Sequence, residues 1–414
     1  MELVNPVPVE DARDWMAALM TTLLASPYDD EFPRRVERRA RTWNPERTWA
    51  YRDHGRIVAT LATEQRTLTV PGPDGGTRDV ETDGLTGVTV AATHRRQGLL
   101  TTMIGESLRA AKERGDALAI LIAAEWPIYG RYGYAPAVSV ADFTYHTKRP
   151  NAALPGVPAG SVRHVEPDEL DPFAAQIFDA ARRRRVGQVD RRRPWWDRRL
   201  GVNGYERIGT QPHWILHEGP DGPDGLLAWQ VKEDFDLSGQ LGAIEVVEFV
   251  DASDAAYRDL FAYLSGLDVI GKVKLGQRPL DEPIRWLMTD GRALQLTGTY
   301  DFLWLRLLDV PAALSARSYA TSGRVVLEVH DESLGGYGAG RYVLDTDGPN
   351  ASCSPTKDEP DLVLSHHALA ACYLGGHRLR QTALRGVEEV TSGALALADV
   401  LFSVPLAPLN QTGF

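Results

Sequence analysis

Apolar positions in the first 125 residues predict two helices, then strands, then one strand–helix–strand unit. Residues 13–25 carry apolar side chains in pairs one helical turn apart, which is the spacing of an amphipathic helix. An apolar pattern of helical period also begins at Leu99 and would end at Gly115, a residue typical of helix C-termini. A further helix is expected over 33–42, strands over 48–52, 56–62, 85–90 and 118–122, and a hairpin turn over 71–76.

The turn between Val90 and Leu99 has the features of an anion-binding site. A helix N-terminus presents unpaired N–H groups and the positive end of its dipole. Arg95 and Arg96 add positive charge that does not titrate, and Gly98 allows the backbone to approach a phosphate closely. We therefore predict a phosphate-binding turn, the alternative being an ordinary strand–turn–helix with solvated arginines.

The remainder of the chain repeats a mixed pattern of strands and helices. A Pro- and Gly-rich stretch at 150–160 marks a domain boundary, and a third segment begins at Asp301. Because single cores seldom exceed roughly 250 residues, a chain of this length should hold two or three domains. Strands are expected at 214–217, 225–229, 243–250, 324–330 and 341–345, and helices at 172–181, 255–265, 366–373 and 393–401.

An arginine-rich stretch at 182–199 contains a second Arg-x-x-Gly sequence, Arg184 to Gly187. A helical pattern precedes this sequence and Pro194 follows it, so we interpret it as a chance match to a phosphate motif. The stretch as a whole is interpreted as a solvated helix with a packed Trp195–Trp196 pair, the alternative being a nucleic-acid surface.

Composition narrows the class of protein. The 414 residues carry a net charge of −11, which disfavours nucleic acid as a partner and suits a cationic one. Cys353 and Cys372 are too few for a disulfide scaffold, and His366-His367 lacks acidic or Cys neighbours at metal-ligand spacing, so no metal is expected. The first residues carry no secretion signal, and the longest uncharged apolar run, 117–124, is too short to span a membrane. We expect a cytoplasmic globular protein.

Specific motifs point to one enzyme family. Arg95-x-x-Gly98-x-Leu100 fits the phosphate-binding pattern of the GCN5-related N-acetyltransferases (GNATs), with a bulkier last residue than usual. The run Ile128-Tyr129-Gly130-Arg131-Tyr132-Gly133-Tyr134 behind Glu125, the Leu-Trp-x-Arg-Leu-Leu-Asp-Val sequence at 303–310 and the end Pro408–Phe414 resemble the Eis (enhanced intracellular survival) family of GNATs. This resemblance spans the chain and implies an α+β fold with three domains: a GNAT domain with the acetyl-CoA site at 1–150, a GNAT-like domain without cofactor motif at 151–300, and a sterol-carrier-like domain at 301–414. It also implies a homo-oligomer, a hexamer.

The resemblance assigns roles to individual residues. Acetyl-CoA would be the co-substrate, and Tyr129 the general acid; a phenol titrates near pH 10 and keeps its proton at pH 7. Tyr132 and Tyr134 are chemically equal candidates, and only the family motif separates them from Tyr129. The general base would be the terminal carboxylate of Phe414, acting directly or through a water. The cofactor would lie against Val88, Thr89, Val90, Arg95, Arg96, Gln97, Gly98, Leu99, Leu100, Thr101, Ala124 and Glu125.

The family also indicates an acceptor: primary amines of small polycationic molecules such as aminoglycosides, acetylated at more than one position. An acidic, aromatic cavity would suit such a cation, and Tyr28, Asp29, Asp30, Glu31 and Trp43 are the candidates for it. Two alternatives stay open. One is transfer to lysines of proteins or peptides, and the other is a non-catalytic carrier that binds lipid in an apolar tunnel of residues 301–414.

Overall fold

The structure is a computed structural model that describes residues 1–27, 29–148, 158–205, 211–234, 241–383 and 386–414. Its first part follows the predicted order of elements. β3 and β4 are longer than expected because their antiparallel pairing continues to the turn at 72–76. The elements of this part are β1 (Glu2–Val4), α1 (Ala12–Thr22), α2 (Phe32–Arg41), β2 (Thr48–Asp53), β3 (Arg56–Pro71), β4 (Thr77–Val90), α3 (Leu99–Glu113), β5 (Leu118–Ile122), α4 (Trp126–Tyr129) and β6 (Ala135–His146).

The second part again places helices between strands, and its predicted strands and helices are all present. The boundary expected at 150–160 lies largely outside the described residues, since 149–157 are not described. The elements are β7 (Ser161–Val165), α5 (Pro167–Arg182), α6 (Arg193–Leu200), β8 (His213–Gly219), β9 (Gly222–Glu233), β10 (Gly242–Asp251), α7 (Asp254–Ser265), β11 (Ile270–Arg278), α8 (Ile284–Leu287) and β12 (Leu294–Leu307).

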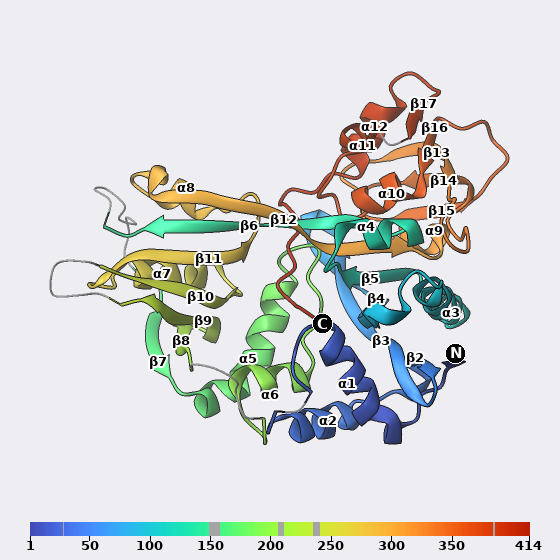
Figure 1. The fold of residues 1–414 in the computed structure, drawn as a ribbon. Helices are drawn as coiled ribbons and strands as arrows, with labels where there is room; N and C mark the ends of the chain where they lie inside the picture. The colour runs from blue at the N-terminus through green and yellow to red at the C-terminus, as the bar shows by residue number, and fades with distance from the viewer. Residues whose placement is uncertain (28, 149–157, 206–210, 235–240, 384–385) are drawn as a thin grey trace.

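One sheet runs through both parts (Figure 1). Its strand order is β1-β2-β3-β4-β5-β12-β6-β11-β10-β9-β8-β7. β12 lies between β5 and β6, pairing antiparallel with both, although about 150 residues of chain separate β12 from β6. Residue 300, the predicted boundary, falls inside β12. The first part of the chain therefore completes its sheet with a strand that follows the second part.

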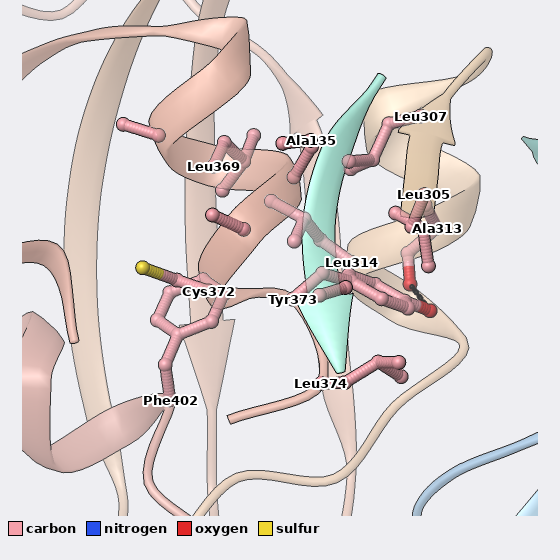
Figure 2. Close-up of a cluster of buried hydrophobic side chains, with 14 of the residues drawn as sticks. Ala135, Leu305, Leu307, Ala313, Leu314, Leu369, Cys372, Tyr373, Leu374 and Phe402 are labelled. Carbon is pink, nitrogen blue, oxygen red and sulfur yellow. Dashed lines mark hydrogen bonds between the residues drawn. The ribbon is translucent and has the colours of Figure 1, made fainter. Parts of the chain in front are cut away.

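The third part packs on this sheet through α10. It forms a five-stranded sheet of order β15-β14-β13-β16-β17. Side chains of α10 fill the space against β12 and α9, and the Tyr373 hydroxyl donates a 2.9 Å hydrogen bond to the Ala313 carbonyl (Figure 2). Its elements are α9 (Val310–Ser315), β13 (Gly323–His330), β14 (Gly340–Thr346), β15 (Ala351–Pro355), β16 (Leu362–Ser365), α10 (His366–Cys372), α11 (Leu379–Thr382), β17 (Val387–Glu389) and α12 (Ala394–Leu401).

Candidate active site

The strands β4 and β5 separate where β4 approaches its end. They pair in parallel only from Asp83 to Leu85, whereas β4 continues paired with β3 as far as Val90. Between Thr86 and Thr89 the strand contains one more residue than the facing segment of β3, which is a β-bulge, and Gly87 has φ +62°. This bulge is next to the opening because β5 no longer covers this part of β4. The residues Val88, Thr89 and Val90 border the opening.

The turn after β4, where the sequence predicts an anion site, leads directly into the start of α3. Arg95, Arg96 and Gln97 are exposed, and Arg96 and Gly98 have positive φ values of 64° and 80°. No side chain caps the first turn of α3, and a Cβ added to Gly98 would meet nothing within 4 Å. The amide groups at the beginning of α3 are therefore free to bind a phosphate, with both guanidinium groups nearby. Leu99 is buried, whereas Leu100 and Thr101 lie nearer the surface.

Tyr129 lies in a buried aromatic group just beyond the end of β5. Its side chain contacts Tyr134 edge to face, with ring centroids 6.3 Å apart. Burial, with a smaller contribution from Glu125, raises the pKa of Tyr129 to about 12. Thr101 and Tyr132 are joined by a 3.1 Å hydrogen bond between their hydroxyls, so the start of α3 and the tyrosine-rich loop are in contact. Ala124 and Glu125 are exposed between β5 and α4.

The C-terminal tail, residues 403–414, returns from the third part of the chain to the first (Figure 1). A segment of the second part, residues 186–191, holds it in place. The Leu409 amide donates to the Val186 carbonyl at 2.9 Å, and the Thr412 hydroxyl donates to the Val189 carbonyl at 2.9 Å. Asn410 and Thr412 are fully buried. Hydrogen bonding of this extent holds the tail in place as far as Thr412.

Arg191 is the main side-chain anchor of the tail. Its guanidinium donates to the Gln411 carbonyl at 3.0 Å and to the Thr412 hydroxyl at 3.2 Å, and it forms an ion pair with Glu248 at 2.7 Å. It also lies 4.0 Å from the centre of the Trp195 ring. The interpretation of 182–199 as a solvated helix is therefore wrong in part, because Arg182 and Arg191 are buried. The expected Trp195–Trp196 packing is present, with ring centroids 4.9 Å apart.

Phe414 ends in a cavity of about 840 Å³, called here the Phe414 cavity. The ring packs against Gly84, where an added Cβ would lie 3.1 Å from it, and the Arg66 guanidinium is 5.1 Å from the ring centroid. Thr86 and Gly87 of the bulge also line this cavity, so it borders the opening between β4 and β5. Tyr129 is not among the lining residues and lies on the α3 side of β4, packed with Leu99.

Arginines dominate the lining of the Phe414 cavity. Glu64 is the one carboxylate side chain among the described residues that form its walls. Three of the arginines lie on α2 and two on α6. The others lie on β3, just before β2 and just before α6. These arginines are Arg35, Arg38, Arg39, Arg47, Arg66, Arg192, Arg198 and Arg199. The cavity expected from the sequence was acidic, and its walls are basic.

The acidic and aromatic residues proposed for the acceptor lie elsewhere. Asp29 forms an ion pair with Arg35 at 2.9 Å, Glu31 pairs with Arg34 at 3.2 Å, and Asp30 is exposed. Trp43 packs on Trp15 and donates to the Val7 carbonyl at 2.8 Å. Neither these acids nor Trp43 lines the Phe414 cavity, and Tyr28 is outside the described residues.

The basic faces of α2 and α6 were not predicted from the sequence. Arg35, Arg38 and Arg39 have the i, i+3, i+4 spacing that places side chains on one helix face, and Trp195, Arg198 and Arg199 repeat it. This periodicity was available in the sequence as a signal for two basic helix faces. That both faces turn toward one cavity depends on contacts between distant parts of the chain.

Comparison with known proteins adds independent findings. Residues 4–137 match an acetyltransferase (GNAT) domain family, residues 187–307 match another, and residues 310–410 match a sterol carrier protein domain. An uncharacterized N-acetyltransferase of Streptomyces griseus is 36% identical over 415 residues, which cover 98% of each chain. N-acetyltransferase Eis of Mycobacterium tuberculosis is 32% identical over 390 residues, covering 87% of this chain and 91% of that protein. The chain belongs to the Eis family of GNAT N-acetyltransferases.

The fold agrees with this membership of the Eis family. The crystal structure of Eis1 from Mycobacterium abscessus superimposes with a TM-score of 0.85 at 28% identity, covering the whole of both chains. The predicted architecture of two GNAT domains followed by a sterol-carrier-like domain is confirmed, and so is N-acetyltransferase activity as the class of function. GNAT domains in general use acetyl-CoA. In the described part of the chain, no helix combines the length and apolar character that crossing a membrane needs.

The two GNAT units of this Eis-family chain differ at the helix that follows their parallel strand. In the second unit β10, α7 and β11 correspond in order and pairing to β4, α3 and β5. The hydroxyl of Ser253 caps α7 by accepting from the Ala256 amide at 2.9 Å, and Asp254 occupies its first turn. A capped and acidic helix start is a poor phosphate site compared with the uncapped start of α3 beside Arg95 and Arg96.

Proposed function

We propose that the chain transfers an acetyl group from acetyl-CoA to a primary amine bound in the Phe414 cavity. The observation that carries this proposal is the position of the chain end. The tail is buried through Thr412, and Phe414 then lies against Gly84, one residue before the pairing of β4 with β5 ends at Leu85. A terminal carboxylate at this position would border both the opening for the thioester and the cavity for the amine. The first GNAT unit alone would bind the cofactor, because the start of α7 is capped and acidic.

The residues around the opening fit a coenzyme with a diphosphate group. Arg95, Arg96, Gln97 and Gly98 and the first turn of α3 would hold the pyrophosphate, while Val88, Thr89 and Val90 would lie along the pantetheine arm. Ala124 and Glu125 would flank that arm from the end of β5. Acetyl-CoA supplies the acetyl group as a thioester, and backbone N–H groups of the bulge would stabilise negative charge on its carbonyl oxygen.

Proton transfer is divided between two groups on different sides of β4. The amine must lose a proton as the new C–N bond forms, and the terminal carboxylate of Phe414 would accept it directly or through a water. A free α-carboxyl ordinarily titrates at about 3.5, so it is ionised at neutral pH. Tyr129 would donate its proton to the sulfur as the C–S bond breaks. Its raised pKa, about 12, keeps the phenol protonated throughout the physiological range.

The resemblance to Eis proteins leads us to expect small polycationic amines, aminoglycosides among them, as acceptors. The arginine-rich walls of the Phe414 cavity favour less cationic amines, because like charges repel at short range. The proposal here is therefore limited to primary amines of small molecules, and a panel that includes aminoglycosides and polyamines measures the preference. The resemblance to the Eis family also implies a homo-oligomer, a hexamer. We propose this assembly separately, and analytical ultracentrifugation tests it.

Extension of the chain by one glycine after Phe414 tests the proposed base. The extension moves the carboxylate by about 3.8 Å, one residue spacing, and leaves a neutral amide in its place. We expect kcat for thiol release from acetyl-CoA in the presence of an amine to fall at least about a hundredfold. Affinity for coenzyme A should be unchanged, and a glycine added before Met1 is the matched control. Equal kcat values for both extended proteins would exclude the terminal carboxylate as the base.

A further inference from the structure

The walls of the Phe414 cavity carry more positive charge than their own acids can neutralise. Glu64 is shared by two arginines, with its oxygens 3.1 Å from Arg39 and 2.6 Å from Arg66. One carboxylate neutralises only one guanidinium, so this cluster stays positive. Arg199 likewise shares Glu248 with the buried Arg191. Arg35, Arg47 and Arg192 have acidic partners outside the lining, so the excess positive charge that suits an anion comes from the other lining arginines.

Two cavity arginines form no ion pair within the described part of the chain. Among the described residues, no carboxylate forms an ion pair with Arg38 or Arg198. Arg38 stacks over Tyr205, with its guanidinium carbon 5.2 Å from the ring centroid, and its Nη1 is buried with no hydrogen-bond partner among the described residues. Nε of Arg66, a side chain only 6% exposed, is also unpaired. Buried donors are nearly always paired in folded proteins, so these atoms indicate an acceptor group supplied by a ligand.

The unpaired arginines are also electrostatically coupled. Desolvation lowers the pKa of Arg198, and repulsion from Arg38 and Arg66 lowers it further, while Tyr205 and Glu64 act in the opposite direction. The coupling means that α2, β3 and α6 direct their guanidinium groups toward the same region. A bound anion would relieve this repulsion and would accept hydrogen bonds from more than one element.

We propose that the acceptor of the acetyl group is an amine that carries its own carboxylate or phosphate, and that this anion binds Arg38 and Arg198. The proposal rests on the proposed function and specifies its substrate class. Planar guanidinium groups bind either anion in a bidentate manner, and Trp15, Trp195 and the Phe414 ring offer apolar surface for the body of the molecule. The anion would bind toward α2 and α6, leaving the amine toward Phe414 and the bulge.

Matched amines of similar size test this acceptor class. 6-Aminohexanoate, hexylamine and 1,6-diaminohexane differ in one terminal group, and glucosamine 6-phosphate differs from glucosamine in its phosphate. We expect kcat/KM to be at least about tenfold higher for the anionic member of at least one set, as a charge-assisted hydrogen bond predicts. The two sets separate a carboxylate from a phosphate as the recognised group.

Arginine variants show whether the preference comes from these side chains. Arg38→Gln and Arg198→Gln should each raise KM for the preferred anionic amine about tenfold, a larger rise than the same variants show for hexylamine. Arg38→Lys should restore part of the loss because it keeps the charge. Arg34→Gln is the control, since Arg34 lies on the same helix, is exposed and does not line the cavity.

The outcomes separate this proposal from the one on which it rests. Highest kcat/KM for 1,6-diaminohexane, or an equal loss toward all amines in Arg38→Gln, would overturn the anionic acceptor while leaving the acetyltransferase intact. The second result would mean that the arginines serve the tail or the fold. If a protein that binds coenzyme A acetylates none of the five amines and no aminoglycoside, the proposed function fails and its acceptor with it.

Discussion

Replacement of Thr412 by valine removes one buried hydroxyl from the tail while keeping the shape of the side chain. That hydroxyl donates to the Val189 carbonyl at 2.9 Å and accepts from Nε of Arg191 at 3.2 Å. The Thr412 amide keeps its hydrogen bond to Asn410, so the backbone of the tail is not otherwise changed. The variant therefore weakens docking of the tail at a position that is two residues away from the proposed base.

The magnitude follows from the two partners that lose a bond. Each is left buried and unpaired, at a cost of about 1–3 kcal/mol. If the loss totals about 3 kcal/mol, the equilibrium constant for tail release rises by roughly two orders of magnitude. A carboxypeptidase that prefers aromatic ends cleaves Phe414 only from the released tail, so its rate should rise in the same proportion when opening is fast.

Mass spectrometry of the intact chain measures this cleavage over time. Thr412→Ser is the matched control, because it retains the hydroxyl and should be cleaved at nearly the wild-type rate. Under the proposed function, the valine variant should also lose kcat, with its affinity for coenzyme A unchanged. If valine and wild-type proteins release Phe414 at the same rate, the tail is not held by this hydroxyl and the argument from its hydrogen bonds fails.

Three further predictions concern the proton donor, the phosphate site and the shared sheet. Tyr129→Phe should lower kcat more than it weakens coenzyme A binding. The wild-type rate should show no loss near pH 10, because the pKa of Tyr129 is raised to about 12. A pH–rate profile that falls near pH 10 in the wild type and not in the variant would contradict this. Joint substitution Arg95→Gln and Arg96→Gln should weaken coenzyme A binding at least about tenfold, measured by calorimetry, with amine KM unchanged. A chain ending at residue 150 should lack cooperative thermal unfolding, because β5 and β6 lose the strand β12 that pairs with both; a cooperative transition would refute this.

Features set by neighbouring residues were predictable from the sequence. The strand before Val90, the turn with Arg95, Arg96 and Gly98, and the helix from Leu99 follow from local periodicity and turn chemistry. The structure has the strand end at Val90 and the helix begin at Leu99 as predicted, although the strand starts earlier, at Thr77. The hairpin at 72–76 and the strand at 118–122 were predicted for the same reason. The family motifs supplied the fold of all three parts, which pattern alone would have left as separate strands and helices.

The role of Arg184–Gly187 shows where local reasoning ends. Its interpretation as a chance match to a phosphate motif agrees with the helix that precedes it, α5. Nothing local indicated that Val186 and Val189 would bind residues more than 200 positions later in the chain. These contacts with the tail depend on how the three domains come together. The acceptors on Val186 and Val189 are backbone carbonyls, which every residue has, so the residue type gives no indication of the contact.

By itself, the sequence determined the local elements, the position of the turn for which we propose phosphate binding, and membership in a family of acetyltransferases. The tertiary structure alone decided the insertion of β12 between β5 and β6, the burial of the tail, and the charge of the Phe414 cavity. The net charge of −11 suggested cationic partners, yet the cavity is lined by arginines from α2, β3 and α6. The reason is that net charge sums over the whole surface, whereas a ligand interacts with the few side chains that folding brings within hydrogen-bonding distance.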